Sequence, residues 1–201
     1  MTCLITGTTS GIGKAIIEKN KDIEFLCVNR KELDLEDINA VKKFKIPMLE
    51  GAILNAGNDK GGGVLFTEHH LDNAIEVLNC NLLANVVLTH KILKANPKAK
   101  ILFVTSTNVN KQYPKNLAYN LSKLGLKNLL DLVRLDHPDA HIKEARVALT
   151  KTNFNANRHK PGHKPINDLY NQKHMTAEQV ATDIIALYKS EESFKEINTN
   201  A

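Results

Sequence analysis

Short apolar segments alternate with helix-like stretches along the whole of this 201-residue chain. Near-continuous apolar segments of this kind are typical of strands that are covered on both faces of a sheet. Strands separated by helices favour parallel pairing, because each helix returns the chain to the same end of the sheet. We therefore predict an α/β fold, a doubly wound parallel sheet flanked by helices, in a single domain over residues 1–201. The expected strands are residues 2–6, 23–28, 51–55, 100–105 and 145–149.

Helical periodicity fills the intervals between these strands. In residues 67–95 apolar side chains recur mostly every three or four positions, and Pro97 ends the pattern. A helix over about 36–45 is expected to open with an acidic first turn, Glu36 and Asp37. We see no internal repeat or linker that would divide the chain. The other expected helices are residues 11–20, 116–135 and 176–189.

The composition argues against several classes of function. Cys3, Cys27 and Cys80 match neither a zinc-site spacing nor a CxxC motif, so we interpret them as small buried side chains. The eight histidines form no HExxH pattern, and no metal is expected. The net charge is +5, but the basic residues are spread along the chain and Trp is absent. A solvated surface and an anionic cofactor explain that charge better than nucleic acid does.

Hydropathy gives a similar exclusion for membranes. The longest apolar runs are far too short to span a bilayer. The chain passes directly from Met1 into the strand TCLIT with no signal peptide before it. We accordingly expect no membrane partner and a cytoplasmic location.

Three glycines lie where the first predicted strand runs into the first helix. The segment reads TGTTSGIG over residues 6–13. Glycine permits a tight turn and the close approach of a phosphate, and the start of a helix offers free N–H groups. Many strand–helix turns contain a glycine, but three at this junction favour a pyrophosphate-binding loop. No GK[ST] follows, which argues against a nucleoside triphosphatase.

Basic residues follow the second predicted strand, where Arg30 and Lys31 come directly after Asn29. In dinucleotide-binding folds an acidic residue here holds the adenosine ribose, whereas an arginine suits a 2′-phosphate. The sequence therefore favours NADP(H), with NAD(H) kept as the alternative. Two basic residues at a strand end can also be merely solvated.

Further motifs follow the glycine loop in a defined order. They are NAG at 55–57, Asn81 in the long helix, Ser106 after the strand ILFVT, and YNLSK at 119–123. Each is weak alone, but together with the glycine loop their order and separations resemble the short-chain dehydrogenase/reductase family. The resemblance covers about residues 2–190. It implies a Rossmann-type fold and an NAD(P)-dependent oxidoreductase.

The resemblance also implies a role for each matched residue. Asp34 would approach the adenine, and Thr152 would take the position that contacts the nicotinamide amide. The implied catalytic tetrad is Asn81, Ser106, Tyr119 and Lys123. The implied cofactor-binding residues are Gly7, Ser10, Gly11, Ile12, Gly13, Asn29, Arg30, Asp34, Asn55, Ala56, Gly57, Tyr119, Lys123 and Thr152.

Tyr119 and Lys123 are spaced to act together. Residues four apart lie one above the other on a helix, about 6 Å apart along its axis. A free tyrosine has a pKa of about 10, which is too high for efficient proton exchange at neutral pH. A nearby ammonium favours the phenolate and lowers that pKa. We therefore expect Tyr119 to act as acid or base in the interconversion of a carbonyl and an alcohol, with Ser106 bonded to the same oxygen.

Simpler explanations exist for single residues. Asn81 could satisfy a backbone group inside a packed helix, and Ser106 could cap a turn. The whole chain could also be a non-catalytic NAD(P)-binding regulatory or redox-sensing protein, or could bind nucleic acid through residues 151–174. A sensor does not need Tyr119 or Lys123, so the enzyme is the leading hypothesis.

Other segments bear on substrate and assembly. Residues 153–174 correspond to the family's substrate-covering segment, and we expect a mobile lid over a small carbonyl or alcohol substrate. One crossover before the NAG strand has room for a single helix, and the tail offers at most one short strand. Because the family often pairs through the helices placed here at 67–95 and 116–135, we expect a homodimer or homotetramer.

Overall fold

A six-stranded parallel sheet forms the centre of the fold, with the strand order β2-β1-β3-β4-β5-β8. The computed structural model describes residues 2–60, 65, 67, 70–111, 113–154 and 173–199. Its topology confirms the predicted doubly wound α/β fold. The strands are β1 (Thr2–Thr6), β2 (Glu24–Val28), β3 (Gly51–Leu54), β4 (Lys100–Ser106), β5 (His141–Val147) and β8 (Phe194–Ile197), and the short strands β6 (Thr150–Lys151) and β7 (Met175–Thr176) pair separately.

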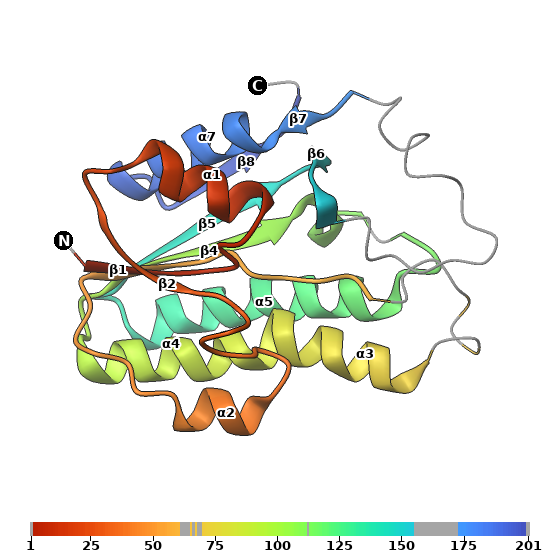
Figure 1. Cartoon of the computed structure of the whole chain (residues 1–201), viewed down its shortest axis with the longest axis horizontal. Coiled ribbons are helices and arrows are strands. Elements are labelled where there is room, and N and C mark those ends of the chain that lie inside the picture. Colours follow the sequence, from red (N-terminus) through yellow and green to blue (C-terminus); the bar gives the residue numbers. More distant parts are fainter. Residues whose placement is uncertain are drawn as a thin grey trace.

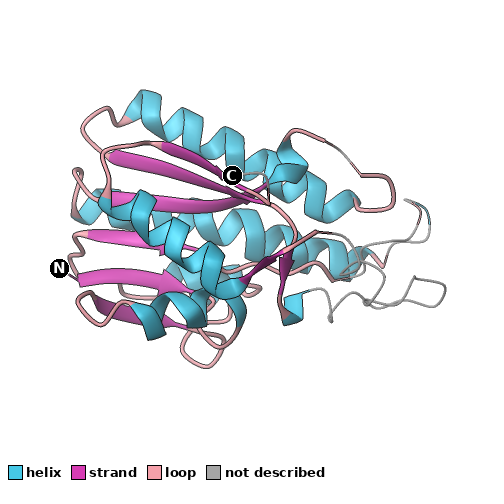
Figure 2. Ribbon diagram, turned by 90° about the horizontal axis from the view of Figure 1, so that it is seen from above, coloured by secondary structure: helices cyan, strands magenta, loops and turns pink. Residues whose placement is uncertain are grey.

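Helices cover both faces of the sheet (Figures 1 and 2). In β1, Cys3 and Ile5 enter one core while Leu4, between them, enters the other. Side chains of successive strand residues point to opposite faces, so a strand buried on both sides must be apolar throughout. On the Cys3 face lie α1 (Gly11–Lys19) and α7 (Ala177–Lys189), and on the Leu4 face lie α2 (Ile38–Lys43), α4 (Ala84–Ala95) and α5 (Leu117–Asp136).

The long helix predicted over 67–95 is interrupted by a π-helical turn. The regular helix begins at Leu71, and α3 (Leu71–Leu78) continues through η2 (Asn79–Leu83) into α4. A π-helical turn is rare and is frequent at functional sites. Asn81 lies in its middle and is completely buried.

The helix predicted over 36–45 is shorter than expected, and its first turn is not acidic. Asp37 is the N-cap of α2, and its carboxylate accepts hydrogen bonds from the backbone N–H groups of Asn39 (2.9 Å) and Ala40 (3.0 Å). Such a cap satisfies N–H groups that have no partner within the helix. Glu36 therefore lies outside the helix, and its carboxylate is available for other contacts.

The strand predicted to begin at residue 145 begins at His141. The prediction was late because the added part of the strand contains two charged residues that are buried. Lys143 and Glu144 are 3 % and 2 % exposed. The Lys143 ammonium donates to the backbone carbonyl of Ser190 (2.8 Å), and the Glu144 carboxylate accepts from the Thr105 hydroxyl (2.6 Å). Ser190 and Thr105 are distant in the sequence, and Glu144 also forms an ion pair with Arg146 two positions along (3.0 Å). The apolar pattern around residue 145 does not indicate these partners.

Both edges of the sheet have the short elements that the sequence predicts. Residues 29–50 hold one helix, α2, and β2 is the outermost strand on that side. The short tail strand β8 pairs with β5 on the other side.

In the part of the chain that the structure describes, no helix has the length and apolar character needed to cross a bilayer.

Candidate functional site

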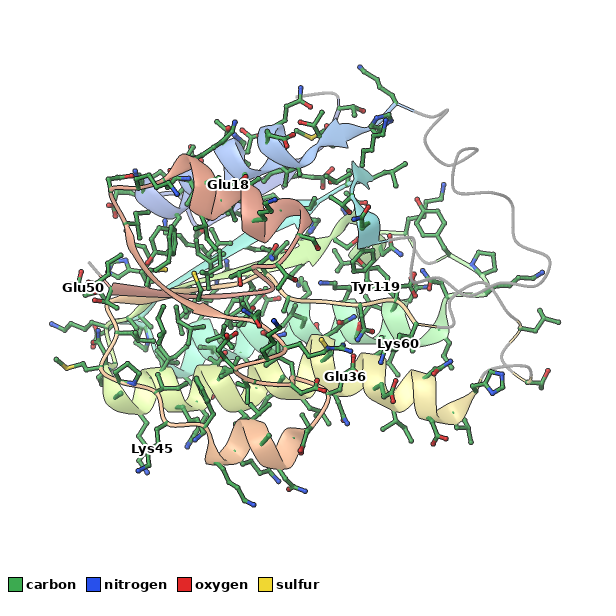
Figure 3. The ribbon with its side chains drawn as sticks, viewed as in Figure 1. Glu18, Glu36, Lys45, Glu50, Lys60 and Tyr119 are labelled. Carbon is green, nitrogen blue, oxygen red and sulfur yellow. The ribbon has the colours of Figure 1, made fainter. Side chains whose placement is uncertain are left out.

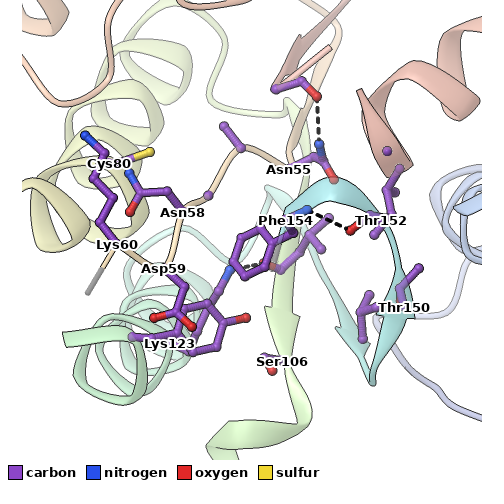
Figure 4. Close-up of a pocket in the computed structure, with 18 of the residues that line it drawn as sticks. Asn55, Asn58, Asp59, Lys60, Cys80, Ser106, Lys123, Thr150, Thr152 and Phe154 are labelled. Carbon is purple, nitrogen blue, oxygen red and sulfur yellow. Dashed lines mark hydrogen bonds between the residues drawn. The ribbon is translucent and has the colours of Figure 1, made fainter. Parts of the chain in front are cut away.

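A cavity of about 1780 Å³ lies where the strands β1 to β5 end. Figure 3 shows Tyr119, Lys60 and Glu36 on this side of the molecule, and Figure 4 gives the cavity in close-up. Ligands of parallel α/β sheets bind at the carboxyl ends of the strands. Among the residues that the sequence assigns to the site, only Gly13 and Asn81 do not line this cavity.

The glycine loop between β1 and α1 forms the tight turn that its glycines predict. Gly7 and Gly11 have φ angles of +73° and +55°, in the left-handed region that favours glycine. A Cβ atom on Gly7 would lie 2.8 Å from Cα of Ala56. Ser10, the N-cap of α1, makes no side-chain cap hydrogen bond. The start of this helix can thus offer N–H groups to an anion in the cavity.

Gly13 lies behind the loop and not at the cavity surface. A Cβ atom there would lie 2.1 Å from the carbonyl oxygen of Gly7 and 2.8 Å from Nδ2 of Asn55. The missing side chain lets α1 approach the loop closely. Gly13 therefore shapes the loop without reaching the cavity itself.

Asn55 and Thr6 join the ends of β1 and β3. The Asn55 amide donates to the carbonyl oxygens of Thr6 (3.1 Å) and Gly7 (3.2 Å). In return, the Thr6 hydroxyl oxygen accepts from the N–H groups of Asn55 (3.1 Å) and Ala56 (3.0 Å). Sequence reasoning missed Thr6, although a threonine at the end of an apolar strand invites the question of what it bonds.

Asn81 holds the loop that follows β3. Its amide donates to the carbonyl oxygen of Asn58 (2.8 Å) and to the Ser122 hydroxyl (3.1 Å), and its Oδ1 accepts from the Asn58 N–H (2.8 Å). This is the simpler of the two explanations considered for Asn81, a buried amide that satisfies backbone groups. Through Asn58, it positions one wall of the cavity and links that wall to α5.

Ser106 ends β4 and lines the cavity. Its hydroxyl oxygen accepts from the Asn108 N–H (3.2 Å) and so caps the short helix η3 (Thr107–Val109). The Asn108 amide in turn donates to Oδ1 of Asn120 on α5 (2.9 Å). The hydroxyl lies at the cavity surface but also donates its proton to Oδ1 of Asn108 (3.3 Å), so it must turn away from Asn108 to donate to a substrate.

Tyr119 and Lys123 lie on α5 and line the cavity, and Figure 4 labels Lys123 there. The Lys123 ammonium lies 5.7 Å from the centroid of the Tyr119 ring and donates to the carbonyl oxygen of Val104 (3.0 Å). The Tyr119 ring meets the Phe154 ring edge-on, with 5.7 Å between centroids. Lys123 is 4 % exposed, and loss of water around its ammonium lowers its pKa to about 8.

Burial of this ammonium has a cost that depends on pH. The pKa of Lys123 falls from 10.5 to about 8 on folding, so between these values the unfolded chain holds more protons than the folded protein. The free energy of unfolding then rises with pH across this window. Below the window, the full cost of burying the ammonium applies. We expect Lys123→Met to be more stable than the wild type at pH 7 by about 2 kcal/mol, after subtraction of the lost bond to Val104.

Urea unfolding measured from pH 7 to pH 10.5 checks this expectation, and the advantage of Lys123→Met should shrink as the pH rises through the window. Lys127→Met is the matched control one turn further along α5. Lys127 is partly exposed and paired with Asp131, so its replacement should change stability little. An advantage for Lys123→Met that is absent or independent of pH would contradict the assigned pKa.

Asn29 and Thr152 also line the cavity. Asn29 accepts a hydrogen bond from the Lys31 N–H (2.9 Å), which shapes the turn after β2. Thr152 lies against the glycine loop, where a Cβ atom on Gly11 would be 3.2 Å from its methyl group. Residues 155–172 of the predicted lid lie outside the described residues. Among the described residues, no group of three or more His, Cys, Asp and Glu is placed to hold a metal ion.

Comparison with known proteins identifies the family of the chain. The family model for short chain dehydrogenase matches residues 32–162, more than half of the chain. The chain belongs to the short-chain dehydrogenase family. The matched segment begins after the glycine loop and includes the NAG, Ser106 and Tyr119 motifs. Membership in this family supports an oxidoreductase. No curated protein matches the sequence significantly.

Solved structures of dehydrogenases share the fold at low sequence identity. A serine dehydrogenase complexed with NADP+ has a TM-score of 0.82 and 17 % identity, with 100 % of this chain and 95 % of that chain covered. A small-chain dehydrogenase in complex with NADPH has 0.81 and 13 %, with coverages of 98 % and 94 %. An alcohol dehydrogenase from the archaeon Thermococcus sibiricus, complexed with 5-hydroxy-NADP, has 0.78 and 19 %, with coverages of 98 % and 96 %.

Proposed function

We propose that this short-chain dehydrogenase is an NADP(H)-dependent enzyme that interconverts a small carbonyl compound and its alcohol, with Tyr119 as acid and base. The observation that carries the proposal is that Tyr119, Lys123 and Ser106 line the same cavity as the glycine loop. A protein that only senses the cofactor has no need of these three side chains. Their presence favours the enzyme over a regulatory NAD(P)-binding protein.

The residues of the cavity fit a dinucleotide cofactor. The glycine loop and the uncapped start of α1 suit its pyrophosphate, and Asp34 and Arg30 line the cavity beyond β2. Arg30 suits a 2′-phosphate, which favours NADP(H) over NAD(H). The NADP complexes among the similar structures support the same choice. When bound, the nicotinamide supplies or accepts a hydride.

The protein's own groups would handle the proton and the orientation. In the direction of reduction, the Tyr119 hydroxyl donates its proton to the substrate oxygen as the carbonyl becomes an alcohol. Ser106 donates a hydrogen bond to the same oxygen and orients the carbonyl. The Lys123 ammonium, buried beside Tyr119, favours the phenolate that remains after proton transfer. In oxidation each of these roles is reversed.

A panel of aldehydes and ketones incubated with the protein and NADPH tests the proposal. We expect at least one compound to accelerate NADPH consumption, with one alcohol formed for each NADPH oxidised. Tight NADPH binding without any acceleration across the panel would favour the regulatory alternative. The same panel with NADH measures how much the reaction depends on the 2′-phosphate.

Arg30→Ala tests the choice of cofactor. The substitution should weaken NADPH binding by roughly 10-fold, because hydrogen bonds to charged groups contribute about 1.5–3 kcal/mol and this side chain is largely exposed. NADH lacks the 2′-phosphate, so its affinity should hardly change. Fluorescence titration of both nucleotides gives the two dissociation constants. Equal losses for NADPH and NADH would remove Arg30 from the 2′-phosphate site.

We further propose that two copies pair through the outer faces of α3–α4 and α5. Large apolar side chains are exposed along both helices, including Leu83 (43 %) and Val86 (39 %) on one and Leu121 (50 %) and Leu132 (59 %) on the other. Sedimentation velocity should show a dimer or tetramer for the wild type, and the monomer for a Leu121→Glu variant. A wild type that stays monomeric at high concentration would contradict this pairing.

A further inference from the structure

Glu36 is the centre of a charged cluster at one wall of the cavity. Its carboxylate accepts from the Lys60 ammonium (2.6 Å) and the Asn58 amide (2.9 Å), and it forms an ion pair with Arg30. Lys60 also bonds Glu76 on α3 (2.7 Å). Arg30, Asn58, Lys60 and Glu76 all line the cavity. Figure 3 labels Glu36 and Lys60 on the side of the molecule that carries Tyr119.

The backbone fixes Glu36 in place, while Arg30 keeps more freedom. The Glu36 N–H donates to the Asp34 carboxylate (3.0 Å), and its carbonyl oxygen accepts from the Asn79 amide (2.9 Å). The Glu36 side chain is 11 % exposed, whereas that of Arg30 is 63 % exposed. Arg30 is therefore the partner that can turn away from the ion pair toward a ligand.

We propose that Glu36 is a specificity-determining residue that holds Arg30 in an ion pair, and that the 2′-phosphate of NADP(H) must compete with this pair. The inference rests on the proposed function, in which Arg30 receives that phosphate. Glu36 thereby lowers the affinity for NADP(H) relative to NAD(H). The role differs from that of a contact residue, because Glu36 acts on the cofactor only through Arg30.

The charges of the cluster give this competition its direction. Glu36 and Glu76 balance Arg30 and Lys60, so these four side chains together are close to neutral, and the Asp34 carboxylate next to Glu36 adds a negative charge. A phosphate carries about −1.5 to −2 charges at neutral pH and gains little from a neutral cluster. Removing the charge of Glu36 leaves the Arg30 guanidinium without its ion-pair partner and gives the four side chains a net positive charge, and both changes favour the phosphate.

Glu36→Gln is the informative variant, because glutamine keeps the size of the side chain and an acceptor for the Asn58 amide. We expect the variant to bind NADPH about five-fold more tightly than the wild type does, because an exposed ion pair contributes a free energy in this range. Its affinity for NADH should stay within about two-fold of the wild-type value. In an Arg30→Ala background the gain should disappear, since no ion pair remains to be released. Fluorescence titrations of both nucleotides measure all four proteins.

Glu76→Gln is the matched control. It makes the same change in charge and also removes a partner of Lys60, but it does not touch Arg30. Its effect on the ratio of NADPH to NADH affinity should therefore be smaller than that of Glu36→Gln. Equal effects of the two variants would overturn the ion-pair explanation in favour of general charge.

Two further outcomes would overturn the inference. If Glu36→Gln weakens both nucleotides equally and lowers the unfolding temperature, Glu36 only braces the cavity wall. If the gain persists in the Arg30→Ala background, it does not act through Arg30. Glu36→Asp, which keeps the charge but shortens the side chain, gives a second measurement and should show part of the gain. Failure of the wild type to bind either nucleotide is a different result, which removes the proposed function and this inference with it.

Discussion

Replacing Tyr119 with phenylalanine is expected to lower the turnover number by roughly 100- to 10,000-fold, the usual contribution of a positioned acid or base. The substitution removes only the hydroxyl group. The ring can still pack edge-on against Phe154, and Lys123 can still bond the carbonyl oxygen of Val104. NADPH affinity should stay within a few-fold of the wild type, so the loss should fall on the chemical step. Steady-state kinetics with the best carbonyl substrate, together with an NADPH titration, separates the two quantities.

Tyr188→Phe is the matched control for this prediction. It makes the same chemical change on α7, in the core on the other side of the sheet and outside the cavity. Its turnover should equal that of the wild type. Turnover in Tyr119→Phe that matched this control would exclude Tyr119 as the acid and base and would leave the family resemblance without its central residue.

Gly13→Ala is expected to destabilise the protein by about 3 kcal/mol or more and to abolish cofactor binding. The new Cβ atom would lie 2.1 Å from the carbonyl oxygen of Gly7, a distance that forces α1 away from the loop. Alanine is favoured over glycine within a helix by about 1 kcal/mol, which is too little to offset a backbone clash. Urea unfolding followed by circular dichroism measures the change.

Gly125→Ala provides the comparison on α5. A Cβ atom there would meet the Leu82 methyl group at 2.7 Å, and the end of a leucine side chain can turn aside. The alanine should therefore cost far less, or even stabilise the helix. If Gly13→Ala proved as stable as Gly125→Ala, the close contact between α1 and the loop would not be a feature of the folded protein.

The parts of the fold predicted best are those with local signals. β1, β3 and β4 are recognisable from a short apolar run, because strands buried on both faces have no polar side to confuse the pattern. β2 is a half-buried edge strand, and its apolar run is recognisable as well. The start of β5 was placed late, since Lys143 and Glu144 look like surface residues in the sequence. Their burial depends on Ser190 and Thr105, which no local pattern connects to them, and on an ion pair of Glu144 with Arg146 two positions along.

The candidate site shows the same division. The motifs located the cavity because each follows a strand end, and parallel strands bring their ends together. They did not distinguish residues that line the cavity from Gly13 and Asn81, which support it from behind. The cluster around Glu36 was missed because its partners come from several separate segments. The π-helical turn at Asn81 was missed because a single extra residue hardly disturbs a periodic apolar pattern.

Every role proposed for the cavity residues requires that the cavity bind NADP(H), and a fluorescence titration of the wild-type protein with NADPH and NADH measures this directly. We expect saturable binding of NADPH, tighter than that of NADH. Binding of neither nucleotide would contradict this expectation, because the glycine loop would then be only a strand–helix turn and the proposed chemistry would have no hydride donor.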